Sequence, residues 1–196
     1  MRTIIDGKGA DRIINKVTKV WNMSVLEQLG IFIENFNIHY SLLLKRYARF
    51  KEIDYPQNLD VDVMTYLDMI LVQIRSFCIE KGKNNYTAQS LLKRLGREDL
   101  AERIDYMLAE KFFDYRDDLT VRNAIKTLTD RFVCHYDAFD RESEVQSELI
   151  EQQLRNPYVK HNLSYIMKIL TECIGEGLTL KSFFRDSEGK RKKELI

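Results

Sequence analysis

The stretch 24-SVLEQLGIFIENFNIHYSLLLKRYARFK-51 decides the fold class of this chain. Its apolar residues recur every three or four positions, the spacing that gathers side chains on one face of an α-helix. They are Leu29, Phe32, Ile33, Phe36, Tyr40, Leu43, Leu44 and Tyr47. Ser24 and Glu27 have the Ser-x-x-Glu form of a capping box, which opens helices. We therefore expect a long helix from Ser24 to about Lys51, with its aromatic side chains in a core.

Shorter amphipathic stretches follow one another along the rest of the chain. The expected helices run from about Ala10 to Trp21, Asp60 to Ile79, Thr87 to Leu95, Glu98 to Phe113, Asp118 to Tyr136, Glu142 to Leu154 and Asn156 to Gly175. Connections are expected at Tyr55–Asn58 and Gly82–Asn85, and Gly96 stands where a C-cap glycine occurs. The run from Glu142 is polar, so we expect it to be exposed.

The chain contains only two prolines and eight glycines, too few for the many turns of an all-β or alternating α/β fold. The sequence therefore predicts an all-α, single-domain helical bundle. We place the domain at residues 1–185 and interpret residues 186–196 as a charged, disordered tail. Phe183 and Phe184, just before the tail, are expected to fold back on the core.

Length, cysteine spacing, charge and hydropathy argue against a disulfide-stabilised, zinc-binding or membrane-spanning protein. A chain of 196 residues is long enough to bury a core without disulfides, and its three cysteines are scattered, with no zinc-ligand spacing. We expect reduced thiols, no metal and no cofactor. Lys plus Arg (31) balance Asp plus Glu (30), so any contact with nucleic acid needs a local patch. The sequence has no apolar run of membrane-spanning length, and we expect a cytoplasmic protein with no membrane partner.

One segment, 130-DRFVCHYD-137, has residues suited to chemistry. On a helix, Arg131 and His135 lie four positions apart and point the same way, beside an apolar stripe. That stripe consists of Val121, Ile125, Leu128, Phe132 and Phe139, with Tyr136 at its side. The pair would therefore lie at the edge of the core, where a second helix or a second subunit meets it.

This segment resembles the Arg…His pattern of HEPN domains, in particular of their abortive-infection branch. In that branch an arginine, an apolar stretch, and a histidine followed by an aromatic or charged residue and Asp end a helix. The preceding layout is also similar, because Arg75-Ser76-Phe77 ends one expected helix and 86-YTAQSLL-92 begins a short one. The resemblance covers most of the chain, from about Val17 to Ile174.

The resemblance implies a homodimer that cleaves RNA without a metal, in bacterial or phage defence or as part of a toxin–antitoxin system. Attack of a ribose 2′-hydroxyl on the adjacent phosphate needs proton transfer and a cation facing the developing charge. His135 would be the acid or base and Arg131 the phosphate clamp. The supporting residues would be Asp130, Tyr136, Asp137 and Arg75. RNA, a second copy and an antitoxin or other protein are the implied partners.

The sequence departs from the family pattern at one point. HEPN domains place four to six residues between Arg and His, whereas three separate Arg131 from His135. The residues five, six and seven positions before His135 are not cationic, and thirteen residues of helix put Arg122 roughly 20 Å away from it. Either Arg131 serves at the shorter spacing, or the domain has the fold without the nuclease.

Structural interpretations of the same residues remain open. Arg131 and His135 could form an edge-of-core pair, with Arg131 reaching Asp68 or Glu80 and His135 near a helix C-terminus. Asp137 also suits a helix end, and Arg75 in an apolar helix is typical of a buried or interface ion pair. His39 and His161 have no acidic residue at helical spacing and are interpreted as packing or surface residues. The alternative to an enzyme is a non-catalytic helical interaction module that binds a protein partner or RNA.

Overall fold

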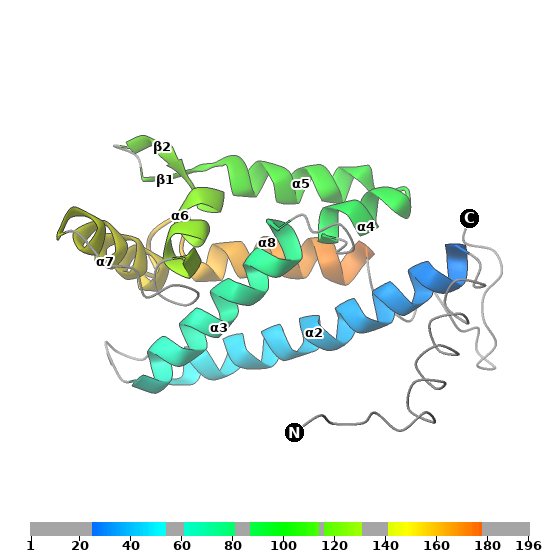
Figure 1. Cartoon of the computed structure of the whole chain (residues 1–196), viewed down its shortest axis with the longest axis horizontal. Coiled ribbons are helices and arrows are strands. Elements are labelled where there is room, and N and C mark those ends of the chain that lie inside the picture. The colour runs from blue at the N-terminus through cyan, green and yellow to red at the C-terminus, as the bar shows by residue number, and fades with distance from the viewer. Residues whose placement is uncertain (1–24, 54–60, 81–86, 114–115, 131–140, 178–196) are drawn as a thin grey trace, which may run out of the picture.

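The computed structural model describes residues 25–53, 61–80, 87–113, 116–130 and 141–177 (Figure 1). Within these ranges the chain forms seven helices and one two-stranded antiparallel sheet. In chain order the elements are α2 (Val25–Ile53), α3 (Val61–Cys78), α4 (Ala88–Arg94), α5 (Glu98–Ala109), β1 (Lys111–Phe113), β2 (Arg116–Thr120), α6 (Val121–Leu128), α7 (Arg141–Arg155) and α8 (Leu163–Gly177). The described protein is mostly helical, as the sequence predicts.

The two longest helices, α2 and α3, pack against each other (Figure 1). The inner face of α2 buries Ile33, Phe36, Tyr40 and Leu43. The ring centroid of Phe36 lies 4.8 Å from that of Phe77 on α3. Helix α2 extends two residues beyond the predicted end at Lys51, and Ser24, the expected first residue of the capping box, lies outside the described residues. Of the aromatic side chains expected in the core, Phe36 and Tyr40 are buried, whereas Phe32 and Tyr47 are partly buried and pack against the core.

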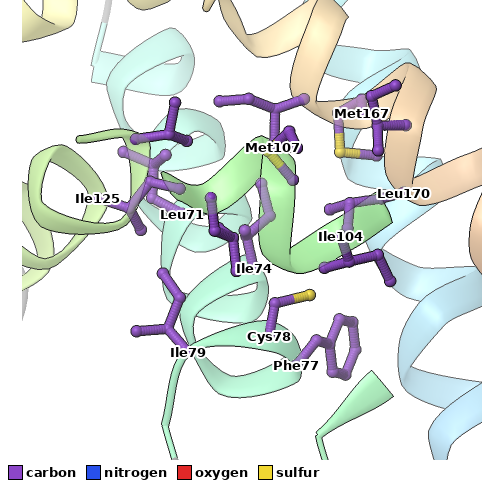
Figure 2. Close-up of a cluster of buried hydrophobic side chains, with 14 of the residues drawn as sticks. Leu71, Ile74, Phe77, Cys78, Ile79, Ile104, Met107, Ile125, Met167 and Leu170 are labelled. Carbon is purple, nitrogen blue, oxygen red and sulfur yellow. The ribbon is translucent and has the colours of Figure 1, made fainter. Parts of the chain in front are cut away.

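The core lies where α3, α5, α6 and α8 meet (Figure 2). Helix α3 contributes Leu71 and Ile74, α6 contributes Ile125, and all three side chains are at most 1% exposed. Figure 2 shows Ile104 and Met107 of α5 and Met167 and Leu170 of α8 in the same cluster. Burial of one such side chain contributes about 1.5–3 kcal/mol relative to its exposure. Contacts among these helices therefore hold the bundle together.

The connection from α4 to α5 follows the capping signals in the sequence. Thr87 is the N-cap of α4, and its hydroxyl accepts a hydrogen bond from the Ser90 amide at 3.2 Å. Gly96 has a φ of 71°, in the left-handed region that favours glycine. The amide of Arg97 donates to the Leu92 carbonyl at 2.9 Å, as in a Schellman motif. The predicted C-cap at Gly96 is confirmed.

The hairpin β1–β2 replaces parts of two expected helices. Helix α5 ends at Ala109 instead of Phe113, and the helix expected from Asp118 begins at Val121. Glu110 turns the backbone into an extended conformation (φ −62°, ψ 147°), which lets Phe112 and Phe113 both become buried. β1 and β2 pair Lys111 with Thr120 and Phe113 with Arg116, with a register irregularity between these pairs. Burial of two aromatic residues thus outweighs helical periodicity here.

Helix α7 differs from the expectation in its burial, and helix α8 differs in its first residue. Helix α7 is not fully exposed, because Ser147, Ile150 and Leu154 are buried against neighbouring helices. Helix α8 begins at Leu163, since the Asn162 side chain accepts a hydrogen bond from the Tyr165 amide at 2.9 Å. The expected cap, Asn156, instead accepts a hydrogen bond from the Tyr158 amide at 3.0 Å. Such a bond from residue i+2 forms an Asx turn, which competes with helix formation.

Several predictions concern residues outside the described ranges. These are the helix from Ala10 to Trp21, the connections at Tyr55–Asn58 and Gly82–Asn85, the pair Phe183 and Phe184, and the tail at residues 186–196. The ends of the proposed domain, residues 1–185, also lie there. Among the described helices, none has the length and apolar character needed to cross a membrane.

Candidate functional site

Two of the six residues singled out from the sequence have a described structure. Arg131, His135, Tyr136 and Asp137 lie outside the described residues. Asp130 is the last described residue before them, two positions after the end of α6, and Arg75 lies in the last turn of α3. The described structure therefore reaches the residue directly before Arg131 and shows how Arg75 contacts it.

Arg75 joins the end of α3 to the end of α6. Its Nη1 donates to the carboxylate of Asp130 and, at 2.8 Å, to the hydroxyl of Thr129. Its Nε donates to the Glu80 carboxylate at 2.7 Å. The Arg75 side chain is only 15% exposed, whereas those of Asp130 and Glu80 are 45% and 51% exposed. One guanidinium, mostly shielded from water, thus fixes two partly exposed carboxylates.

The same carboxylates offset the effect of burial on Arg75. Burial alone would lower the pKa of its guanidinium, but the hydrogen bonds and negative charges of Asp130 and Glu80 raise it above the ordinary value. Glu80, one of the two residues considered for Arg131 from the sequence, is an ion-pair partner of Arg75. The other, Asp68, lies on α3, and burial raises the pKa of its carboxyl.

Thr129 follows the last residue of α6 and bonds back to that helix. Its amide donates to the carbonyls of Ile125 and Lys126. The buried Thr129 hydroxyl donates to the Ile125 carbonyl at 2.8 Å while accepting from Arg75. These contacts hold the two residues that directly precede Arg131.

A second polar cluster, absent from the sequence-based candidates, lies around Glu110 at the end of α5. The Glu110 carboxylate is 8% exposed and receives Lys160 Nζ at 2.8 Å on Oε1. The Tyr165 hydroxyl donates to Oε2 at 3.0 Å, and Nδ1 of His161 lies 3.6 Å from that oxygen. The His161 side chain is 9% exposed, with its ring edge-on to Tyr165. Lys160 and His161, just before α8, and Tyr165, in its first turn, thus lie around the Glu110 carboxylate.

The electrostatics of this Glu110 cluster follow from its hydrogen bonds. The bond to Glu110 and the charge of Glu110 raise the pKa of the Lys160 ammonium. Burial, followed by the bond to Glu110, raises the pKa of the Tyr165 phenol. Lys160 is therefore charged and Tyr165 remains a hydrogen-bond donor at neutral pH. The cluster consists of a carboxylate, an ammonium and a neutral phenol beside an imidazole.

A hollow of about 410 Å³ opens beside the Glu110 cluster. Its lining consists of Tyr106, Ala109, Glu110, Lys111, Lys160 and His161. Sequence spacing gave no sign of it, because His161 and Glu110 are far apart in the chain and meet only in the folded protein. In the part of the chain that the structure describes, no three His, Cys, Asp or Glu side chains are placed to hold a metal ion together.

The described structure is therefore a mostly α-helical protein with one ionic cluster at Arg75 and another at Glu110, besides ion pairs such as Arg103–Glu172 between α5 and α8. No protein-family model, curated protein or solved structure matches the chain. Its function must be argued from its own residues.

Proposed function

We propose that the chain is a HEPN-like protein that acts on RNA as a metal-independent endoribonuclease. His135 acts as the general acid or base, and Arg131 binds the phosphate that becomes more negative as the 2′-hydroxyl attacks. The mostly helical fold supports the proposal. So do the residue types in the segment 130-DRFVCHYD-137.

The observation that carries the proposal is the ion pair between Arg75 and Asp130. Asp130 directly precedes Arg131, and Arg75 binds both Asp130 and its neighbour Thr129. Catalysis needs its groups held in a fixed geometry, and hydrogen bonds from supporting residues supply that. Arg75 is therefore a positioning residue. It anchors the backbone that leads to Arg131 and does not itself touch the RNA.

The active form in this proposal is a homodimer. Two copies bring their Arg131–His135 segments together at a two-fold axis, so that each copy completes one composite site. Such an isologous interface should bury more than about 1,000 Å² in total. The biological setting is bacterial or phage defence or a toxin–antitoxin system, in which an antitoxin or another protein controls the cleavage.

A second candidate function is a helical interaction module without catalysis, and exposed apolar residues on α2 favour it. Ile31, Ile38 and Leu42 are 41%, 55% and 40% exposed. Their spacing of seven and four residues places them on one face of the helix. An exposed apolar face of this kind suits a protein partner. With this function the chain binds RNA or protein and cleaves neither.

The test of the first function is incubation of the purified chain with single-stranded RNA in excess EDTA. Attack by the 2′-hydroxyl leaves a 2′,3′-cyclic phosphate on the 5′ fragment, because the oxygen of the departing strand is displaced. We expect fragments with this end, identified by mass spectrometry. RNA that stays intact over a broad set of sequences, while the chain retains a bound partner, would favour the interaction module.

A further inference from the structure

Helix α2 runs along the edge of the described helices and has an apolar outer face (Figure 1). Its inner face packs on α3 and buries Phe36 and Tyr40. Ile38 lies two residues from each of them, so at about 100° per residue its side chain points to the opposite side. Ile31 and Leu42 share that side, and all three side chains are exposed. Apolar side chains gathered on one exposed face are typical of interaction surfaces.

Opposite charges lie toward the two ends of this apolar stripe. Glu34 lies four residues before Ile38, Lys45 lies three residues after Leu42, and both side chains are exposed. Eleven residues are about three helical turns, so Glu34 and Lys45 lie on the same flank of the stripe, about 16 Å apart along the helix. They are too far apart to bind each other within one chain. Among the described residues, neither belongs to an ion pair, so both charges are available to a partner.

An antiparallel pair of α2 helices satisfies both charges. With a two-fold axis midway between Ile38 and Leu42, each Ile38 lies level with the partner's Leu42. Glu34 lies six residues before that axis and Lys45 five residues after it. Each Glu34 is then within about 1.5 Å, measured along the helix, of the level of the partner's Lys45, on the same flank. A parallel pair would instead place like charges level with each other, which is unfavourable. The charges therefore favour an antiparallel second copy.

We propose that the outer face of α2 binds the same face of a second copy of the chain, antiparallel, about a two-fold axis between Ile38 and Leu42. The contact is isologous, because each copy supplies the same apolar stripe and the same two charges. The inference rests on the second candidate function, whose partner it identifies as a second copy. It uses no residue of the segment 130-DRFVCHYD-137, so this contact and the proposed nuclease can fail separately.

The experiment is sedimentation of the full chain over a range of concentrations, with Glu34→Lys and Lys45→Glu studied separately and mixed. Each variant alone places like charges at both ion pairs and should weaken self-association by about fivefold or more. In the mixture one chain has two lysines and the other two glutamates, so a mixed pair restores both contacts. We expect the mixture to have a higher average mass than either variant alone. A dimer formed through the Arg131 segment would be the same in all three samples.

Two sets of controls separate this contact from general effects. Glu148→Lys on α7 mixed with Lys168→Glu on α8 has the same net charges at exposed positions outside α2, and this mixture should gain no mass. Ile38→Gln removes the centre of the apolar stripe with a residue that favours helix, and it should weaken self-association by about fivefold or more. Val145→Gln, at an exposed apolar position of α7, should self-associate like wild type.

Thermal melts establish that each variant is folded before sedimentation. The proposal is overturned if the average mass of the wild-type chain does not rise with concentration up to about 1 mM, since even a weak interface would associate there. It is also overturned if the mixture of Glu34→Lys and Lys45→Glu gains no more mass than the control mixture. Equal self-association of Ile38→Gln and Val145→Gln would overturn it as well, because the stripe would then have no part in the contact.

Discussion

The guanidinium of Arg75 and the carboxylate of Asp130 form an ion pair between residues fifty-five positions apart in the chain. Arg75 belongs to α3 and Asp130 follows α6, so the pair links the ends of two helices that are far apart in the chain. The Thr129 hydroxyl accepts a second bond from the same guanidinium at 2.8 Å. This contact fixes the direction of the chain immediately before Arg131.

Removal of the Arg75 charge should destabilise the protein. We expect Arg75→Met to lower the free energy of unfolding by about 1–2 kcal/mol, because Asp130, Glu80 and the buried Thr129 hydroxyl lose their shared partner. Urea denaturation followed by circular dichroism measures the change. Arg49→Met is the matched control, since the ion pair of Arg49 with Glu52 is exposed, and its stability should stay close to wild type. Equal losses in both variants would show that the Arg75 contacts have no special role.

Most described helix ends follow local signals in the sequence, whereas the hairpin after α5 depends on long-range contacts. Thr87 and Gly96 mark the ends of α4 correctly because capping involves only neighbouring residues. The hairpin after Glu110 was not predicted, because the pattern of Phe112 and Phe113 also fits the end of a helix. Only their burial together in the folded protein decides for a strand.

The candidate site residues show the same contrast between local signals and long-range contacts. Sequence resemblance selected Asp130 and Arg75, but it could not indicate that one binds the other, because they belong to different helices. The Glu110 cluster was missed for a related reason. His161 has no acidic residue at helical spacing, and its carboxylate neighbour comes from the end of α5. An acidic residue directly after a predicted helix was the only available signal, and it is too common to be specific.

Two glycines of α8 should respond in opposite directions to the same substitution. A Cβ at Gly177 would lie 2.1 Å from Leu92 Cδ2 and 3.1 Å from Leu100 Cδ1, whereas a Cβ at Gly175 would extend into open space. We expect Gly177→Ala to destabilise the protein by about 1–3 kcal/mol through overpacking. Gly175→Ala should stabilise it by up to about 1 kcal/mol, since alanine favours helix. Thermal unfolding of both variants measures this, and a destabilised Gly175→Ala with an unaffected Gly177→Ala would contradict the packing of α8 on α4.

The pKa of Asp68 predicts a pH-dependent stability difference. Burial raises the pKa of this carboxyl above 3.8, so its ionised form is disfavoured in the folded state. Asp68→Asn should therefore stabilise the protein at pH 7, by up to about 0.5 kcal/mol because solvent still reaches the side chain. As pH falls through the folded and then the unfolded pKa, wild type becomes protonated and the difference should vanish.

Urea titrations at pH 7 and pH 3 measure this difference. Asp118→Asn, at an exposed position of β2, is the control for the loss of one negative charge. A gain for Asp68→Asn that is larger at pH 3 than at pH 7 would contradict the sign of the shift.

The most direct test of the proposed function is the rate of RNA cleavage in excess EDTA by His135→Ala compared with wild type. We predict a loss of about a hundredfold or more, the usual contribution of a general acid or base, with the helical content unchanged. His39→Ala, an exposed histidine of α2, should cleave at the wild-type rate. Arg131→Lys should also be impaired, because a point charge does not replace a planar guanidinium. Cleavage by His135→Ala at the wild-type rate would contradict the assignment of His135 as the catalytic residue.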